Sequence, residues 1–98
     1  NAVTGLSPST VLTLQSTSAD SASSYLSIIA GSTGSTAQAA IFFGDADDYD
    51  IGKLLYRNSD NSMDFVVNAG SKMKILSSGN VGIGTTAAAS LLHRRHWL

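Results

Sequence analysis

Residues 62–84, SMDFVVNAGSKMKILSSGNVGIG, decide the fold class of this chain. The stretch holds three short apolar runs, and small or polar turn residues separate them. In the first run Met63, Phe65 and Val67 fall on one side of an extended chain, with Asp64 and Val66 on the other. Alternation with a period of two is typical of a strand with one buried face. Short runs joined by tight turns predict an antiparallel β-meander.

The same pattern extends toward the N-terminus, where further short runs are rich in β-branched and aromatic residues. Seven strands are predicted, over residues 11–17, 25–31, 39–45, 51–57, 62–68, 72–77 and 81–84. Helical periodicity begins only at Thr86, whose hydroxyl suits a helix N-cap. A short helix is therefore predicted there, with Leu91 and Leu98 seven residues apart, a spacing that suits contact among three helices.

The expected organisation has three parts. Residues 1–10 form a linker with a turn at Ser7 and Pro8, residues 11–86 form the β-rich module, and residues 87–98 form a tail. The alternation predicts which side chains of the module are buried: Met63, Phe65, Met73, Ile75, Val81 and Ile83. It also predicts that three charged side chains are exposed: Asp64, Lys72 and Lys74.

The composition leaves little material for a core. Ser, Thr, Ala and Gly supply 45 of the 98 residues, and the large apolar residues come in short bursts. A lone chain of this size buries only a modest share of its surface. We therefore expect the chain to complete its core with copies of itself, as an intertwined homotrimer without a stable folded monomer.

Charge and cysteine content exclude several classes of protein. Six Lys and Arg residues stand against seven Asp, so the basic face that nucleic acid requires is missing. The chain has no cysteine, which excludes disulfides and thiolate metal sites. No run of about 18 apolar residues is present to span a membrane. The chain lacks a visible signal peptide and begins with Asn, so we expect it to be a piece of a longer or processed polypeptide.

The glycines of SSGNVGIGTT, residues 77–86, invite a phosphate-loop interpretation. A P-loop ends in Gly-Lys-Ser/Thr, but Gly84 is followed by two threonines, and the spacing of Gly79, Gly82 and Gly84 does not match a dinucleotide fingerprint. An architectural role fits better. Val81 and Ile83 would anchor the strand in the interior, and the bare glycine face would let the backbone of a neighbouring chain approach closely.

Part of the sequence resembles a module of bacteriophage tail-fibre and related appendage proteins. The matching motifs are IFFGD, GKLLYRNSDNSMDFVVNAGSKMKILSSGNVGIGTT and the Leu-His pair at residues 92–93, and the good match runs from Ala39 to Thr86. In that family a Gly-x-apolar-x-Tyr strand, an SDNSM turn, a Phe strand, a KMKI strand and a GNVGIGT ending follow in this order. The family usually continues with Pro and KLHV, where this chain has AAASLLHRRHWL.

The resemblance implies a β-rich homotrimeric segment of a virion fibre, often ahead of a C-terminal intramolecular chaperone. The expected function is thus structural, in an extracellular virion appendage, with other fibre or tail proteins as partners. The alternative is a receptor-binding tip that recognises a host surface glycan or protein. Neither function requires a cofactor or membrane insertion.

The acidic run from Asp45 to Asp50 is the first candidate for ligand chemistry. Its ligand-facing candidates are Asp45, Asp47, Asp48, Tyr49 and Asp50, because hard cations bind clustered carboxylates. Counted from Asp45, however, positions five, six and twelve of an EF-hand loop would be Tyr49, Asp50 and Tyr56, so that site fails. The preferred interpretation is an exposed turn whose charge protects the neighbouring IFF run from edge pairing.

The remaining candidates argue against an enzyme. His93 and His96 could share a metal on a helix, but without acids or cysteines beside them a solvated basic chain end is preferred. No base accompanies a nucleophile, and the GxSxG motif does not occur. Asp64 with an acid of the loop is a conceivable glycosidase pair that nothing singles out. Exposed tyrosines could stack on a sugar, whereas Phe43, Tyr56 and Phe65 are expected to fill the trimer core.

Overall fold

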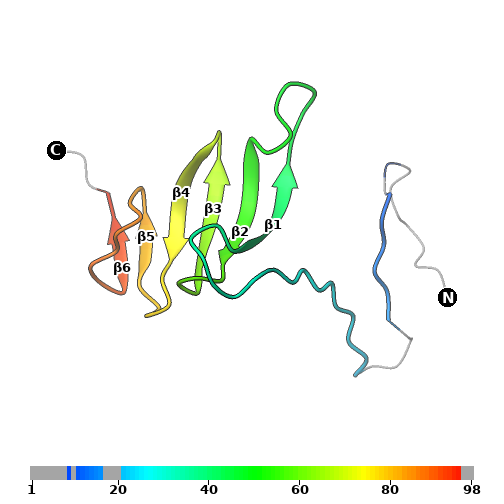
Figure 1. Ribbon diagram of the computed structural model, residues 1–98, viewed down its shortest axis with the longest axis horizontal. Coiled ribbons are helices and arrows are strands. Elements are labelled where there is room, and N and C mark those ends of the chain that lie inside the picture. Colours follow the sequence, from blue (N-terminus) through cyan, green and yellow to red (C-terminus); the bar gives the residue numbers. More distant parts are fainter. Residues whose placement is uncertain (1–8, 10, 17–20, 96–98) are drawn as a thin grey trace.

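The computed structural model describes residue 9, residues 11–16 and residues 21–95. These residues contain six β-strands and no helix, so the predicted all-β class is confirmed. The strands are β1 (Gln38–Phe43), β2 (Gly52–Arg57), β3 (Ser62–Val67), β4 (Gly70–Ile75), β5 (Val81–Ile83) and β6 (Leu92–Arg94). They form one sheet in which spatial order follows chain order, from β1 to β6 (Figure 1).

The first five strands form the predicted antiparallel meander. Each pairs with its neighbour in sequence, and they correspond to the predicted strands at residues 39–45, 51–57, 62–68, 72–77 and 81–84. The β3–β4 hairpin turns through two residues with positive φ, Asn68 at 51° and Ala69 at 62°. Two left-handed central residues are the geometry of a type I′ turn, whose twist matches that of the flanking strands.

A β-bulge interrupts the β3–β4 ladder. Phe65 lies opposite Met73 and Val66 opposite Ser71, so Lys72 is the extra residue on β4. Lys72 is exposed, as the alternation predicted. The bulge keeps the apolar positions of β4 in step with those of β3 despite the inserted residue.

Two predicted strands are wrong for this chain on its own. Neither residues 11–16 nor residues 25–31 form a strand, and residue 17 lies outside the described part of the chain. Residues 11–17 alternate and residues 25–31 are rich in β-branched and aromatic residues, but a strand exists only where a neighbour accepts its backbone hydrogen bonds. Residues 21–31 instead follow an irregular path outside the sheet (Figure 1).

The C-terminal segment contains a strand where a helix was expected. Residues 86–95 form no helix, and Leu92–Arg94 make β6, which pairs with β5 in parallel; residues 96–98 lie outside the described part. A parallel partner must be reached by a crossover, here residues 84–91. Ala88 of this crossover is buried, and its carbonyl accepts a hydrogen bond from Asn80 Nδ2 at 3.3 Å. Packing of the crossover on the sheet thus outweighs the helical tendency of a short alanine run.

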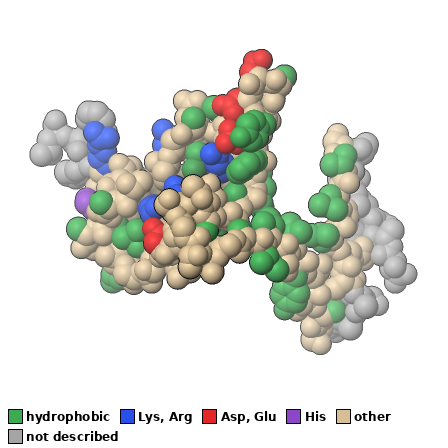
Figure 2. Space-filling model, viewed as in Figure 1, with side chains coloured by type: hydrophobic (Ala, Val, Ile, Leu, Met, Phe, Trp, Pro, Cys, Tyr) green, Lys and Arg blue, Asp and Glu red, His purple; other side chains and the backbone are tan. Residues whose placement is uncertain are grey.

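The core of the single chain is thin. Among the described residues only Leu55 and Ala88 are apolar and fully buried. The Cα radius of gyration is 17.2 Å, whereas a compact chain of this length has about 13 Å. Apolar side chains are visible on the surface of both the sheet and the extended segment (Figure 2). The fold therefore leaves much of its apolar surface in contact with solvent.

Candidate interaction surface

One face of the sheet carries an apolar surface that crosses all six strands. The registers place its residues in two adjacent rows, because directly opposed residues of neighbouring strands share a face. We call this surface the apolar face. Its first row is Ala39, Tyr56, Met63, Ile75, Val81 and Leu92; its second row is Ile41, Leu54, Phe65, Met73 and Ile83, and ends at the charged Arg94 of β6.

The single chain leaves this face partly in water. Phe65 is 36% exposed and Ile83 is 41% exposed, so the predicted burial of these two side chains is wrong for the isolated chain. Met63, Met73, Ile75 and Val81, also predicted to be buried, are half-buried. The alternation identified the correct common face, but the chain has no second layer to cover it. Full burial of a large apolar side chain contributes about 1.5–3 kcal/mol, so burial of this face against a partner would contribute substantially to the free energy of association.

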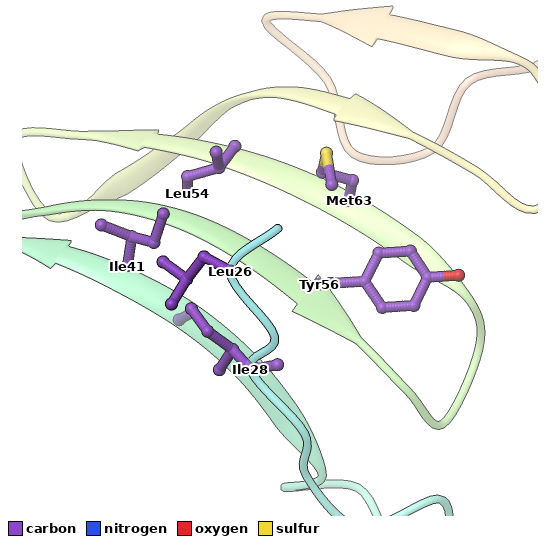
Figure 3. A pocket seen from close by; sticks show the side chains of 8 residues that line it. Leu26, Ile28, Ile41, Leu54, Tyr56 and Met63 are labelled. Atoms are coloured by element: carbon purple, nitrogen blue, oxygen red, sulfur yellow. The ribbon is translucent and has the colours of Figure 1, made fainter. Parts of the chain in front are cut away.

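Residues 21–31, which we call the strap, cover one end of the apolar face. Leu26 and Ile28 of the strap line a groove of about 230 Å³ together with side chains of β1, β2 and β3 (Figure 3). The groove also includes Ala39, Ala40, Ile41, Leu54, Tyr56 and Met63. Asn58 holds the end of the strap, because its Nδ2 donates to the Gly31 carbonyl at 2.9 Å. The strap thus covers the face near β1 and leaves the part on β4 and β5 open.

The strap itself is apolar on two sides. Leu26 and Ile28 contribute to the groove, whereas Tyr25 and Ile29, at odd positions, are 84% and 90% exposed. An extended segment with large apolar side chains in both directions is typical of a chain packed between two layers. Only one of those layers is supplied by the described residues.

The opposite face of the sheet, which we call the polar face, carries charged side chains together with the buried Leu55, and it holds a buried charge. Asp64 is 2% exposed, which contradicts its predicted exposure. Its Oδ1 lies 3.2 Å from Lys74 Nζ on β4, and its Oδ2 lies 3.4 Å from Arg57 Nε on β2. Lys74, also predicted to be exposed, keeps only 12% of its side chain exposed. Two cations on flanking strands therefore compensate a carboxylate that the sequence pattern assigned to solvent.

A second carboxylate on the turn before β3 is held by hydrogen bonding. Ser62 Oγ donates to Asp60 Oδ1 at 2.6 Å. This hydrogen bond, with the nearby charges of Lys74 and Arg57, lowers the pKa of Asp60. The hydrogen bond between Ser62 and Asp60 thus stabilises the β2–β3 turn, next to the cluster of Arg57, Asp64 and Lys74.

The acidic loop between β1 and β2 uses its carboxylates to build its own turn. Asp45 Oδ1 accepts the backbone N–H groups of Asp47 and Asp48, each at 2.9 Å, and these bonds lower the pKa of Asp45. Asp48 Oδ1 accepts the N–H of Asp50 at 3.1 Å. Asp50 pairs with Lys53 at 2.9 Å, which lowers the pKa of Asp50. Within the part of the chain that the structure describes, no three His, Asp, Glu or Cys side chains are grouped to hold a metal ion.

Aromatic side chains gather beside this loop. The rings of Phe42 and Tyr49 lie 5.9 Å apart, and Lys53 Nζ lies 5.5 Å from the centre of the Phe42 ring. Tyr49 is 74% exposed and Phe43 is 60% exposed. Phe43, which we expect to fill a trimer core, lies at the end of β1 and is exposed in the single chain.

Gly82 of β5 and Gly84, which follows β5, lie where other atoms of the chain leave no room for a side chain. A Cβ on Gly82 would collide with the carbonyl oxygen of Thr85, and a Cβ on Gly84 would lie 2.8 Å from Arg95 Cβ. Gly84 also has a φ of +76°, which L side chains rarely adopt. The close backbone approach that the sequence predicted is present, but the approaching backbone is the chain's own crossover.

The two histidines are not brought together by the described structure. His93 Nδ1 accepts the Ala89 N–H at 3.3 Å, and His96 lies outside the described residues. His93 faces the polar side of the sheet through its pairing with Gly82. Its ring nitrogen thus stabilises the end of the crossover.

Comparison with known proteins adds no relatives. No protein-family model matches the sequence, and no curated protein matches it. Among residues 9, 11–16 and 21–95, no helix is present that could cross a lipid bilayer.

Proposed function

We propose that this chain is a structural module of a bacteriophage tail fibre or similar virion appendage, and that it works by assembling with copies of itself as a homotrimer. The observation that carries this proposal is the open apolar face, two rows of side chains across a single sheet layer. A sheet needs a second layer to bury its apolar face, and the described residues supply only the strap.

Surface area supports self-association. The chain exposes 7595 Å², whereas a compact monomer of its mass exposes about 5,300 Å². The difference of about 2,300 Å² is larger than the roughly 800 Å² that a standard protein interface removes from each partner, so it leaves room for more than one interface. The fibre assignment itself rests on the resemblance of residues 39–86 to fibre modules.

The mass in solution tests the proposal. Sedimentation equilibrium and native mass spectrometry at micromolar concentration should give three times 10.1 kDa. A folded species of 10.1 kDa under those conditions would contradict the proposal. As a matched pair, Met73→Ser on the apolar face should shift the protein toward smaller species, whereas Lys72→Ser at the adjacent bulge should not.

The exposed aromatics beside the acidic loop favour a second candidate, a tip that recognises a host surface glycan. Tyr49 and Phe43 offer accessible ring surface beside carboxylates, the combination that stacks on and hydrogen-bonds to a sugar. A glycan-array screen of the intact protein tests this function. Binding that disappears in Tyr49→Ala, and persists in Tyr25→Ala, would support it.

A further inference from the structure

The strap and the open half of the apolar face are two different apolar surfaces on one molecule. Tyr25 and Ile29 form the outer side of the strap, and Phe65 and Ile83 lie on the part of the face that the strap leaves open. We propose that the outer side of the strap of one copy packs on the open half of the apolar face of a second copy. This inference rests on the proposed self-assembly and specifies its contact.

The chemistry of the two surfaces supports the pairing. Each is made mainly of large aliphatic and aromatic side chains. Arg94 of β6, opposite Ile83, is the charged residue at the edge of this face, whereas Asp64 and Lys74 lie on the opposite face. The inner side of the strap already lies beside such a surface, since Leu26 and Ile28, 58% and 45% exposed, line a groove together with Ile41 and Leu54. The outer side would repeat the same type of contact with the other end of the face in a neighbour.

The contact is heterologous, because the surface given by one copy differs from the surface that receives it. Heterologous contacts close into rings when the rotation permits, and each copy then takes part in two interfaces. A standard interface removes about 800 Å² from each partner. Two such interfaces fit within the surface that this chain exposes in excess of a compact monomer, about 2,300 Å².

Complementation between two variants tests the proposal. The strap variant carries Tyr25→Asp and Ile29→Asp, and the face variant carries Phe65→Asp and Ile83→Asp. Each alone should be monomeric, because each lacks one side of every contact. Mixed in equal amounts they should form a 1:1 heterodimer, with the intact strap of the face variant on the intact face of the strap variant. Far-UV circular dichroism establishes that each variant retains its sheet.

The result separates this contact from its competitors. If the strap variant alone assembles like the unmodified protein, the faces pack on each other symmetrically; the inference is then wrong and self-assembly stands. If the unmodified protein is itself monomeric, the proposed function fails and the inference fails with it.

Crosslinking provides a test that does not depend on how the aspartate variants fold. The chain contains no cysteine, so single thiols can be placed without background. Chains carrying Ile29→Cys, mixed with chains carrying Ile83→Cys, should be joined by a short bismaleimide into a heterodimer on a denaturing gel. The matched control replaces Ile83→Cys with Lys53→Cys on the polar face, which should give at least tenfold less product. Equal yields from both mixtures would overturn the proposal.

Discussion

Asp64 Oδ1 lies 3.2 Å from Lys74 Nζ across the β3–β4 ladder, on the face of the sheet opposite the two apolar rows. The carboxylate is almost fully buried, and Arg57 approaches its other oxygen from β2. A buried charge is costly unless it is paired, so this carboxylate requires its two neighbours. The two faces of the sheet thus differ in kind: one carries two apolar rows that remain partly exposed, and the other holds a buried carboxylate whose charge is compensated.

Asp64→Asn should destabilise the protein by about 2–4 kcal/mol, because Lys74 would keep a largely buried charge without its counter-ion. Urea unfolding at one fixed protein concentration measures this change, because the proposed self-association would make the midpoint depend on concentration. Lys72→Gln is the control, because Lys72 is exposed at the bulge and should change stability by less than about 0.5 kcal/mol. An unchanged midpoint in Asp64→Asn would show that the pair contributes nothing.

Ala69→Gly should stabilise the protein by about 0.5–1 kcal/mol. Ala69 adopts a φ of 62° in the β3–β4 turn, a conformation that is strained for alanine and free of strain for glycine. The change creates Asn-Gly, the dipeptide that type I′ turns prefer. Ala46→Gly in the β1–β2 loop is the matched control, since Ala46 has no positive φ and glycine there only adds flexibility to the unfolded chain. A lower midpoint for Ala69→Gly would contradict the assigned turn.

Three glycine substitutions should rank in a fixed order of cost. Gly79→Ala places a methyl group in open space at a φ of +92°, so only the backbone penalty of about 1 kcal/mol applies. Gly84→Ala combines a φ of +76° with a close approach to Arg95 Cβ and should cost more. Gly82→Ala must displace the crossover at the Thr85 carbonyl, with about 1–3 kcal/mol for overpacking. Thermal midpoints of the three variants measure the order, and a harmless Gly82→Ala would refute the close approach.

Acid titration should show the hydrogen bonds of the acidic loop. The pKa of Asp45 is lowered in the folded chain from an ordinary value of 3.8, because its carboxylate accepts two backbone N–H groups. A depressed folded pKa contributes stability that is complete above the unfolded value and is lost as the pH falls through the folded value. The loop should therefore keep its structure at pH 5 and loosen below about pH 4. Carboxyl chemical shifts followed by NMR measure this, and a midpoint above 3.8 for Asp45 would contradict it.

Removal of the Asn58 side chain should release the strap. Asn58→Ala deletes the hydrogen bond from Nδ2 to the Gly31 carbonyl and leaves the bond from the Asn58 backbone N–H to Ala37 intact. We expect faster amide hydrogen exchange over residues 21–31 and little change in β3 and β4. Ser59→Ala, at the neighbouring exposed position, is the control. Equal exchange of the strap in both variants would show that Asn58 does not anchor it.

The sequence predicted the meander because its signals are local. Alternation within each run and turn residues such as Asn68 between runs determine neighbouring antiparallel pairs without reference to distant parts of the chain. The burial of Asp64 was missed because an alternation pattern assigns every charge to solvent. Register contains the missing signal, since a two-residue turn at residues 68–69 brings Asp64 level with Lys74 once the bulge is allowed for.

The parallel strand β6 was not predictable in the same way. It depends on a crossover that brings Leu92 beside Val81. A short sequence pattern does not predict pairing between strands that are separated by such a crossover. The two strands predicted at residues 11–17 and 25–31 show the opposite case. Their local pattern is strand-like, but the structure pairs the described residues of neither segment with the free edge of β1, which shows that a strand-like pattern does not by itself determine pairing.

The strictly sequential order of β1 to β5 has a kinetic consequence. Every antiparallel pair joins strands that are adjacent along the chain, so the sheet can grow by successive hairpins on the microsecond scale. Meeting another chain is slower and depends on concentration. Under the proposed self-assembly, each newly made chain therefore passes through an interval in which its sheet exists and its apolar face is still uncovered. Synthesis of several copies close together would shorten that interval and favour the correct encounter over aggregation.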